Sequence, residues 1–333
     1  MKIAVIGSGS WGTAISILLA QKGYEVCLWS WKQEETDRLN KDRENKEFLP
    51  GCAFPENIIC SHSMAECTKD ASLVITAVPS PATRTIAKQL SEVIVPGQHI
   101  LNISKGIEHK TLMRLSEVYS EEIPQADISV MSGPSHAEEV SRSLPTTNVV
   151  ASANPETAKW IQETIMTDVF RVYTSNDITG VELGGALKNV IALCAGITDG
   201  VGYGDNTKAA LMTRGLAEIT RLGVAMGAQP ETFAGLSGIG DLIVTCTSMH
   251  SRNRRAGILL GKGKSLAETL DEIHMVVEGV NTSSAAYELS KRYNVEMPIT
   301  EAAYDILYNG KSPLDAAYEL MTRDKKPELE VKI

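Results

Sequence analysis

The stretch KIAVIGSGSWGTAISILLAQKG, residues 2–23, constrains the fold more than any other part of the chain. It places glycines in the spacing G-x-G-x-x-G between an apolar run and an amphipathic helical pattern. Gly7 would allow a tight turn, Gly9 would let a pyrophosphate approach the backbone, and Gly12 would permit close packing of the helix. The free N–H groups at the helix N-terminus suit phosphate oxygens. A glycine-rich turn of another α/β fold is the alternative, but this context predicts a dinucleotide-binding unit.

The first half of the chain carries the pattern of a parallel sheet. Helical stretches alternate with six apolar runs that each end in Gly, Ser or Pro: KIAVIG, EVCLWS, SLVITAVP, HILNIS, ISVMSG and TNVVAS. Strands buried on both faces read as nearly continuous apolar runs, as these do. We therefore expect an α/β, Rossmann-like doubly wound sheet of parallel strands in the N-terminal half.

From about residue 178 the pattern changes to helices. Apolar residues recur at helical spacing through 181–201, 208–227, 255–263, 265–273, 281–293, 297–308 and 313–322. The polar segment YTSND supplies the connection between the two patterns. The sequence thus predicts a Rossmann dinucleotide-binding domain at 1–177 and an all-helical substrate and catalytic domain at 178–333. The tail from residue 322 is expected to be a loosely held charged end.

Charge and composition restrict the classes of ligand. The chain has 333 residues, a hydrophobic content of 43% and a formal net charge of −9, which argues against nucleic acid or an anionic membrane as a surface partner. An anionic ligand would need positive charge gathered locally. Six cysteines without a CxxC pair and six histidines without HxxxH signal no metal site and suggest reduced thiols in a cytoplasmic protein. No apolar stretch reaches the roughly 20 residues that span a bilayer.

The end of the second predicted strand bears on the choice of cofactor. An NAD site usually places an acidic residue there to hold the ribose 2′-hydroxyl. This chain offers Ser30, Trp31 and Lys32, which would suit a 2′-phosphate better. NADP is therefore favoured, with NAD possible. In the alternative, Lys32 is solvated and Glu34 or Glu35 contacts the ribose.

Polar residues follow the carboxyl ends of two later strands, where ligands collect in open α/β sheets. Lys105 follows HILNIS, and Gly133 and Ser135 follow ISVMSG, with Pro134 suited to the first helical turn. A solvated lysine and an ordinary strand-to-helix turn are the plain alternatives.

The helical half adds two polar groups. Asp241 lies between a glycine-rich turn and an apolar run, where it could simply favour a helix N-terminus. Ser251, Arg252 and Asn253 combine a hydroxyl, a guanidinium and an amide, which together make a credible phosphate clamp. A solvated basic helix start is the alternative.

Lys188 is the one charged group in the otherwise small and apolar segment GGALKNVIAL. Its helical neighbours include no carboxylate, and Asp199 lies about 16 Å along the axis at 1.5 Å per residue. Any partner must therefore come from elsewhere in the fold. A mid-helix lysine is usually a surface residue, but one desolvated in a cleft has a lowered pKa suited to proton transfer beside a nicotinamide.

Seven motifs resemble those of one family. They are GSGSWGTA, ENKEFLPG, SKGIE, SGPSHAEEV, ELGGALKNVIALCAGITDGVGYGDNTKAAL, GLSGIGDLIVTCTSMHSRNRRAG and VVEGVNT. Together they cover nearly the whole chain, which is similar to the cytosolic NAD(P)-dependent glycerol-3-phosphate dehydrogenases, the bacterial branch in particular. Cys194 departs from the family pattern, which usually has Gly or Ala there, and this puts packing rather than chemistry in doubt.

The resemblance implies a fold, a reaction and a set of residues. The helical domain would be like the 6-phosphogluconate dehydrogenase C-terminal domain, and the protein a homodimer. It would reduce dihydroxyacetone phosphate to sn-glycerol 3-phosphate for glycerophospholipid synthesis. Lys188 resembles the general acid/base, Lys105 would polarise substrate and touch cofactor, and Asp241 would orient that centre. The substrate-binding residues would be Lys105, Gly133, Ser135, Lys188, Asp241, Ser251, Arg252 and Asn253. The cofactor-binding residues would be Gly7, Gly9, Ser10, Trp11, Gly12, Trp31, Lys32, Lys105, Ala137, Arg252, Val276 and Glu278.

Two rivals remain open at the level of the sequence. One is another dehydrogenase with a Rossmann and a helical domain, acting on a sugar acid or a hydroxyacyl thioester. The other is a redox sensor that binds NAD(P) without turnover. Such a sensor would have little reason to carry Lys105, Lys188, Asp241 and the Ser251 to Asn253 triplet together.

Overall fold

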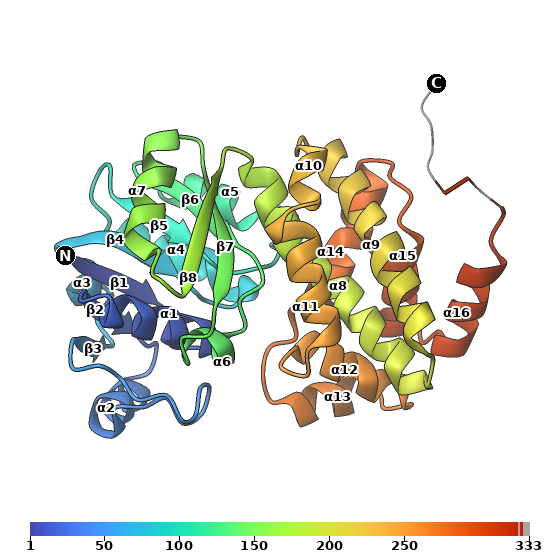
Figure 1. Ribbon diagram of the computed structural model, residues 1–333, viewed down its shortest axis with the longest axis horizontal. Coiled ribbons are helices and arrows are strands. Elements are labelled where there is room, and N and C mark those ends of the chain that lie inside the picture. Colours follow the sequence, from blue (N-terminus) through green and yellow to red (C-terminus); the bar gives the residue numbers. More distant parts are fainter. Residues whose placement is uncertain (326, 329–333) are drawn as a thin grey trace.

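The computed structural model describes residues 1–325 and 327–328 and has two lobes side by side (Figure 1). The N-terminal lobe contains a sheet with helices on both faces, and the C-terminal lobe is built of helices. The charged end predicted from residue 322 lies partly outside the described residues.

The sheet has eight strands in the order β3-β2-β1-β4-β5-β6-β7-β8. They are β1 (Lys2–Ile6), β2 (Glu25–Trp29), β3 (Ile58–Ser61), β4 (Ala71–Thr76), β5 (His99–Asn102), β6 (Asp127–Ser132), β7 (Thr146–Ser152) and β8 (Phe170–Ser175). All six predicted strands are confirmed, while β3 and β8 were missed. The expectation of parallel pairing fails at one place, because β7 runs antiparallel to β6.

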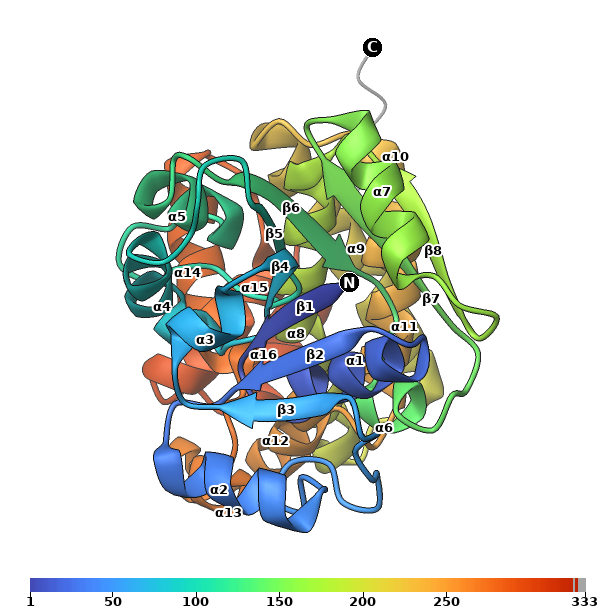
Figure 2. The same cartoon turned by 90° about the vertical axis from the view of Figure 1, so that its left-hand side faces the viewer.

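Helices cover both faces of the sheet (Figure 2). The helices of this lobe are α1 (Ser10–Gln21), α2 (Gln33–Asp42), α3 (Met64–Thr68), α4 (Thr83–Ser91), α5 (Leu115–Glu122), α6 (Ala137–Val140) and α7 (Pro155–Ile165). One apolar core joins the sheet to α1, α6 and α7, and a second core on the opposite face joins it to α3, α4 and α5. Because both faces of the sheet are buried against apolar side chains, the central strands are continuous apolar runs.

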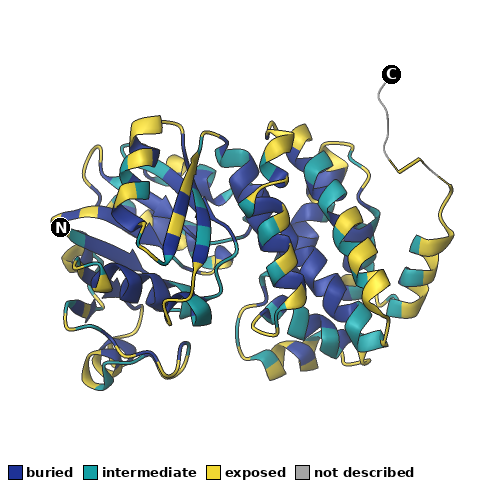
Figure 3. Ribbon diagram, in the orientation of Figure 1, coloured by how far each residue is buried: buried dark blue, intermediate teal, exposed yellow. Residues whose placement is uncertain are grey.

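The C-terminal lobe is arranged around one long helix, α8 (Ile178–Val201). Around it lie α9 (Asp205–Ala225), α10 (Pro230–Phe233), the short helical turn η2 (Leu236–Gly240), α11 (Asp241–Thr247), α12 (Arg252–Gly261), α13 (Leu266–Ile273), α14 (Glu278–Arg292), α15 (Pro298–Tyr308) and α16 (Pro313–Thr322). Every residue from Gly180 to Ile197 is buried, as the dark centre of this lobe shows (Figure 3). By length and composition α8 could cross a membrane, but its most apolar window is wholly covered by protein.

Glycines let α12 approach α8 at backbone contact distance. A Cβ atom on Gly257 would lie 2.0 Å from the Leu193 carbonyl oxygen, and one on Gly196 would lie 2.0 Å from the Arg254 carbonyl oxygen. Only a residue without a side chain fits such a crossing. The close approach packs α12 against the C-terminal half of α8, next to the segment that carries Lys188.

Candidate active site

Two lysines from different lobes share one buried carboxylate. Lys188, in the middle of α8, donates to Oδ1 of Asp241, the first residue of α11. Lys105, which follows β5, donates to the other oxygen, Oδ2, at 2.7 Å. Asp241 and Lys188 are only 1% and 5% exposed. The partner that α8 itself lacks is therefore supplied by a residue 53 positions later in the chain.

Burial and charge set the protonation of this cluster. Burial lowers the pKa of Lys188 to about 8, and the Asp241 carboxylate keeps it from falling further. Burial alone would raise the pKa of Asp241, but the Lys105 and Lys188 ammonium groups outweigh it and hold the pKa below its ordinary value. The carboxylate is thus ionised at neutral pH, and Lys188 can gain or lose a proton near it.

Thr245 is a member of the cluster that the sequence reasoning missed. Its hydroxyl accepts a hydrogen bond from the Lys188 ammonium at 2.7 Å and donates to the Asp241 carbonyl oxygen at 2.6 Å. Residues four apart lie on one face of a helix, so the position of Thr245 relative to Asp241 was a usable signal. The threonine fixes one donor direction of the ammonium in addition to the carboxylate.

The loop after β6 brings Gly133 and Ser135 to the same cluster. The Gly133 carbonyl oxygen accepts from Lys105 at 2.9 Å and from the Ser135 hydroxyl at 3.0 Å. Gly133 has φ +148°, and a Cβ atom there would lie 2.9 Å from Oδ1 of Asn148. Pro134 is not the first helical residue, since α6 begins only at Ala137. A longer turn thus separates strand and helix than the sequence suggests.

His136, in the same loop, faces the cations. Burial and the Lys188 ammonium lower its pKa, which keeps the imidazole neutral. Its buried Nε2 has no hydrogen-bond partner within the described chain. The ring lies 5.8 Å, centroid to centroid, from that of His250, which precedes Ser251 in the other lobe.

The Ser251 to Asn253 triplet forms the start of α12, next to α8. Ser251 caps the helix by accepting from the Arg254 amide at 3.2 Å. Asn253 donates to the side chain of Asn189 at 2.9 Å and accepts from the Gly279 amide at 2.8 Å. Because Asn189 directly follows Lys188, this chain of bonds links the triplet to the lysine cluster.

Arg252 and Glu278 make hydrogen bonds at the start of α14. Arg252 donates to the Val276 carbonyl oxygen at 3.0 Å. Glu278 accepts from the amide and the hydroxyl of Ser80, at 2.9 and 2.5 Å, after β4 in the other lobe. No sequence signal pointed to Ser80. The Ser80 to Glu278 bonds and the Lys105 to Asp241 pair join the two lobes.

The β1 to α1 turn is shaped to receive a phosphate. Gly7 has φ +118°, and a Cβ atom on Gly12 would lie 1.9 Å from the Gly7 carbonyl oxygen. A Cβ atom on Gly9 would instead meet nothing within 4 Å. No side chain caps α1, so the first N–H groups of the helix have no side-chain acceptor and suit an anion. The turn thus fits a dinucleotide pyrophosphate.

The carboxyl end of β2 presents a cation and an aromatic face. The Lys32 ammonium lies 4.5 Å from the centre of the Trp31 ring, and Trp31 is 64% exposed. Glu35 is buried and accepts from the Ser8 hydroxyl at 2.7 Å, so its carboxylate is engaged inside the lobe. The end of β2 thus presents one cation and one exposed aromatic ring at the surface. Ser30 is fully buried and contributes no surface.

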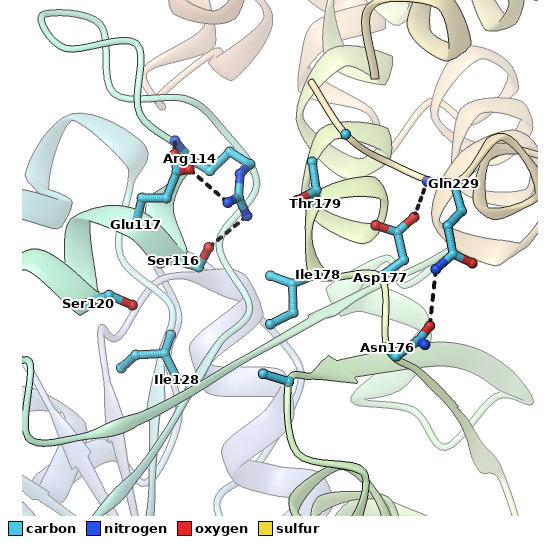
Figure 4. A pocket seen from close by; sticks show the side chains of 12 residues that line it. Arg114, Ser116, Glu117, Ser120, Ile128, Asn176, Asp177, Ile178, Thr179 and Gln229 are labelled. Carbon is cyan, nitrogen blue, oxygen red and sulfur yellow. Dashed lines mark hydrogen bonds and ion pairs between the residues drawn. The ribbon is translucent and has the colours of Figure 1, made fainter. Parts of the chain in front are cut away.

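A polar pocket of about 520 Å³ lies elsewhere between the lobes (Figure 4). None of the predicted site residues lines it. Its guanidinium, Arg114, is bonded to Glu117 at 2.8 Å and to Glu182 at 2.9 Å, and Asp177 caps α8 through the Gly180 amide. These bonds tie α5 and α8 together, so the pocket belongs to the connection between the lobes and not to the lysine cluster. Within residues 1–325 and 327–328, no group of three or more His, Cys, Asp or Glu side chains could hold a metal ion.

The chain resembles known proteins over nearly its whole length. A family model described as NAD-dependent glycerol-3-phosphate dehydrogenase N-terminus matches residues 2–158, and its C-terminus counterpart matches 177–318. Curated glycerol-3-phosphate dehydrogenases [NAD(P)+] of Thermoanaerobacter sp. and Bacillus cytotoxicus are 55% and 54% identical, over 99% of this chain and 99% and 97% of theirs.

A solved structure gives the same result. The crystal structure of glycerol-3-phosphate dehydrogenase from Coxiella burnetii is 37% identical, with a TM-score of 0.94, over 97% of this chain and 99% of that one. D-mandelate dehydrogenase, at 14% identity and a TM-score of 0.64 over 95% and 99%, shares the fold alone. The expected fold class, with its Rossmann-like sheet and helical C-terminal lobe, is confirmed. The chain therefore belongs to the NAD-dependent glycerol-3-phosphate dehydrogenase family.

Proposed function

We propose that this chain is an NAD(P)-dependent sn-glycerol-3-phosphate dehydrogenase that reduces the C2 carbonyl of dihydroxyacetone phosphate. One observation carries the assignment of the chemistry: the buried cluster in which Asp241 holds the two ammonium groups of Lys188 and Lys105. A bound nicotinamide would supply the hydride, and the protein must then supply a proton to the oxygen that becomes a hydroxyl. The product would feed glycerophospholipid synthesis.

Lys188 is the proton donor in this proposal. With a pKa of about 8, the ammonium is protonated at neutral pH and yet gives up its proton more easily than an ordinary lysine. Asp241 and Thr245 fix two of its three N–H directions, which leaves one for the substrate oxygen. Asp241 is a positioning residue, while Lys105 provides a second cation to polarise the carbonyl and to touch the cofactor.

The phosphate of the substrate needs its own anchor. The Arg252 guanidinium and the α12 N-terminus, with Ser251 and Asn253, offer donors beside Lys188. Gly133 and Ser135 would close the site from the other lobe, next to Lys105. The site therefore gathers cations locally in a protein whose formal net charge is −9.

NADPH is the preferred cofactor in this proposal. Lys32 and the Trp31 face would hold the 2′-phosphate and the adenine, with Gly7, Gly9, Ser10, Trp11 and Gly12 around the pyrophosphate. Ala137, Val276 and Glu278 complete the set, together with Lys105 and Arg252. The engagement of Glu35 with Ser8 supports this preference, because it removes one carboxylate that could have received a ribose 2′-hydroxyl.

The test follows the loss of NADPH absorbance when dihydroxyacetone phosphate is added, with NADH in a parallel series. We expect turnover with both cofactors and the larger kcat/KM with NADPH. Lys32→Glu should raise the KM for NADPH and leave that for NADH nearly unchanged. Lys41→Glu, an exposed change of the same charge on α2, is the matched control.

Three outcomes would contradict parts of the proposal. Turnover only with a sugar acid or a hydroxyacyl thioester would indicate the rival dehydrogenase. Binding of NADPH without turnover of any of these compounds would indicate the sensor. An equal effect of Lys32→Glu on the KM for both cofactors would contradict the assignment of Lys32 to the 2′-phosphate. The domain division at residue 177 and the homodimer stay predictions, and light scattering of the full chain would test the homodimer.

A further inference from the structure

Two cysteines of the N-terminal lobe lie against each other away from the proposed active site. Cys27 lies in the middle of β2 and Cys67 in α3, and their Sγ atoms are 2.6 Å apart. Both belong to the apolar core between the sheet and α3, with exposures of 7% and 0%. Both are free thiols. A disulfide has its sulfur atoms about 2.05 Å apart, so very little movement separates this pair from a bond.

We propose that Cys27 and Cys67 form an oxidisable dithiol that a hydroperoxide converts to an intramolecular disulfide. The Cys27 sulfur attacks one peroxide oxygen, the O–O bond breaks, and Cys27 sulfenic acid and water are formed when the oxidant is hydrogen peroxide. The Cys67 sulfur then attacks the Cys27 sulfur, the S–O bond breaks, and a second water leaves. Each thiol gives up one hydrogen, and the peroxide accepts the two electrons.

The surroundings favour Cys27 as the attacking sulfur. A hydrogen bond from Cys67 lowers the pKa of Cys27, and the Lys2 ammonium adds to this against the opposing effect of burial. Lys2 is held there because it donates to the carbonyl oxygens of Glu66 and Lys69, both at 2.7 Å, at the end of α3. A cation beside a thiol favours the thiolate, which is the form that reacts with peroxide. Hydrogen peroxide is small and uncharged, and α3 has only five residues, so local opening of this helix gives it access.

Cys60 provides an internal control. It lies on β3, the neighbour of β2 in the sheet, but belongs to the core on the opposite face. Burial raises its pKa to about 12. Cys60 is therefore close in the fold to Cys27 but faces away from it and stays protonated, and it should take no part in the reaction.

The disulfide would act on the cofactor end of the lobe. Two residues after Cys27, β2 ends at Trp29, whose indole N–H donates to the His62 carbonyl oxygen at 2.9 Å, just before α3. Two residues further on, Trp31 and Lys32 form the surface described above. A bond between positions 40 residues apart would thus tie α3 to the strand that presents this surface. It would also restrict the unfolded chain and raise the denaturation midpoint.

The test uses the full chain and chemical readouts that do not require turnover. Reduced protein is treated with hydrogen peroxide, alkylated with N-ethylmaleimide in denaturant, and analysed by intact mass and peptide mapping. We expect label on four of the six cysteines, a linked Cys27–Cys67 peptide, a mass lower by about 2 Da before alkylation, and full reversal by dithiothreitol. Cys67→Ala should lose the linked peptide, whereas Cys60→Ala should keep it.

The proposal would be overturned by label on all six cysteines after peroxide, by irreversible oxidation of Cys27 without a link, or by a link that involves Cys60. If Cys67→Ala fails to fold, the peptide map of the unaltered chain still decides between these outcomes. Fluorescence titration should show that oxidation changes the affinity for NADPH, and an unchanged affinity would overturn the proposed effect on the cofactor end of the lobe. None of these readouts depends on the substrate, so a failure of the proposed function would be seen separately.

Discussion

The lowered pKa of Lys188 leads to a prediction about the pH dependence of catalysis. Burial brings its pKa from the ordinary 10.5 to about 8, a shift worth about 3 kcal/mol at 1.36 kcal/mol per pH unit. If Lys188 donates the proton during reduction, only the ammonium form is active. The kcat/KM for dihydroxyacetone phosphate should then be level below pH 8 and fall about tenfold per unit above it. A lysine with an ordinary pKa would keep the profile level to about pH 10.

The reverse reaction should show the opposite pH dependence. Oxidation of glycerol 3-phosphate requires the neutral amine as the base, so its kcat/KM should rise through pH 8 and level off above it. The substrate phosphate titrates near pH 6, well below the limb expected at pH 8, so the two titrations can be told apart. Initial rates in both directions between about pH 6.5 and 10 would measure the two opposite limbs.

Two arginine variants identify which lysine is responsible. Lys188→Arg places a guanidinium that stays charged throughout this range, so the limb at pH 8 should vanish and kcat should fall by about 10²- to 10⁴-fold. Lys105→Arg is the control, because it keeps a cation on the other oxygen of Asp241 and leaves Lys188 in place. A limb at pH 8 that persists in Lys188→Arg, or a level profile in the unaltered chain, would refute the reasoning.

Three further predictions concern this site and the helical lobe that carries it. Asp241→Asn removes the charge that supports the Lys188 pKa, so the alkaline limb should move below pH 8 and the denaturation midpoint should fall; an unmoved limb would exclude the pairing as its cause. Gly257→Ala drives a methyl group into the Leu193 carbonyl oxygen, so it should cost about 1–3 kcal/mol of stability and raise the KM for substrate, as urea unfolding and initial rates would measure. Glu218, a buried residue of α9, accepts hydrogen bonds from the Ile299 and Thr300 amides. Burial raises its pKa from 4.5 to about 7, so the folded state binds this proton more tightly and stability should fall by roughly 3 kcal/mol as pH rises from 4.5 to 7. Glu218→Gln should flatten this part of the urea midpoint profile, and an unchanged slope would assign the pH dependence to other groups.

The central strands were predictable because a strand buried on both faces has apolar residues at nearly every position. The two strands that were missed are the edges of the sheet. β3 has only four residues, of which Ile59 is 65% exposed, and β8 alternates between buried and exposed positions, with Tyr173 47% exposed. An edge strand lacks the second neighbour, so its pattern is diluted by polar positions. The antiparallel β7 left no signal, since an apolar run carries no direction.

The residues of the candidate site were predictable by type, but their contacts were not. Lys105 and Asp241 are 136 residues apart, and nothing local to either predicts that they bond. Helical spacing could have added Thr245 to Asp241. Ser80 could not be predicted from the sequence, because its partner Glu278 lies 198 residues later in the chain and in the other lobe. The sequence also showed that Lys188 has no partner on its own helix, which correctly moved the search for one to the rest of the fold.

The energetic cost of the cluster is itself an argument for its chemistry. α8 is buried from Gly180 to Ile197, and the surrounding core of the lobe is apolar. Replacing a buried ion pair with well-packed apolar residues is often neutral or stabilising by about 1–4 kcal/mol. The packing of α8 therefore gives no reason for an ammonium at Lys188, and Asp241 in turn requires a cation because it is itself buried. The same burial that makes the pair expensive lowers the pKa of Lys188 toward neutrality, so the cost to stability and the capacity for proton transfer have one physical origin.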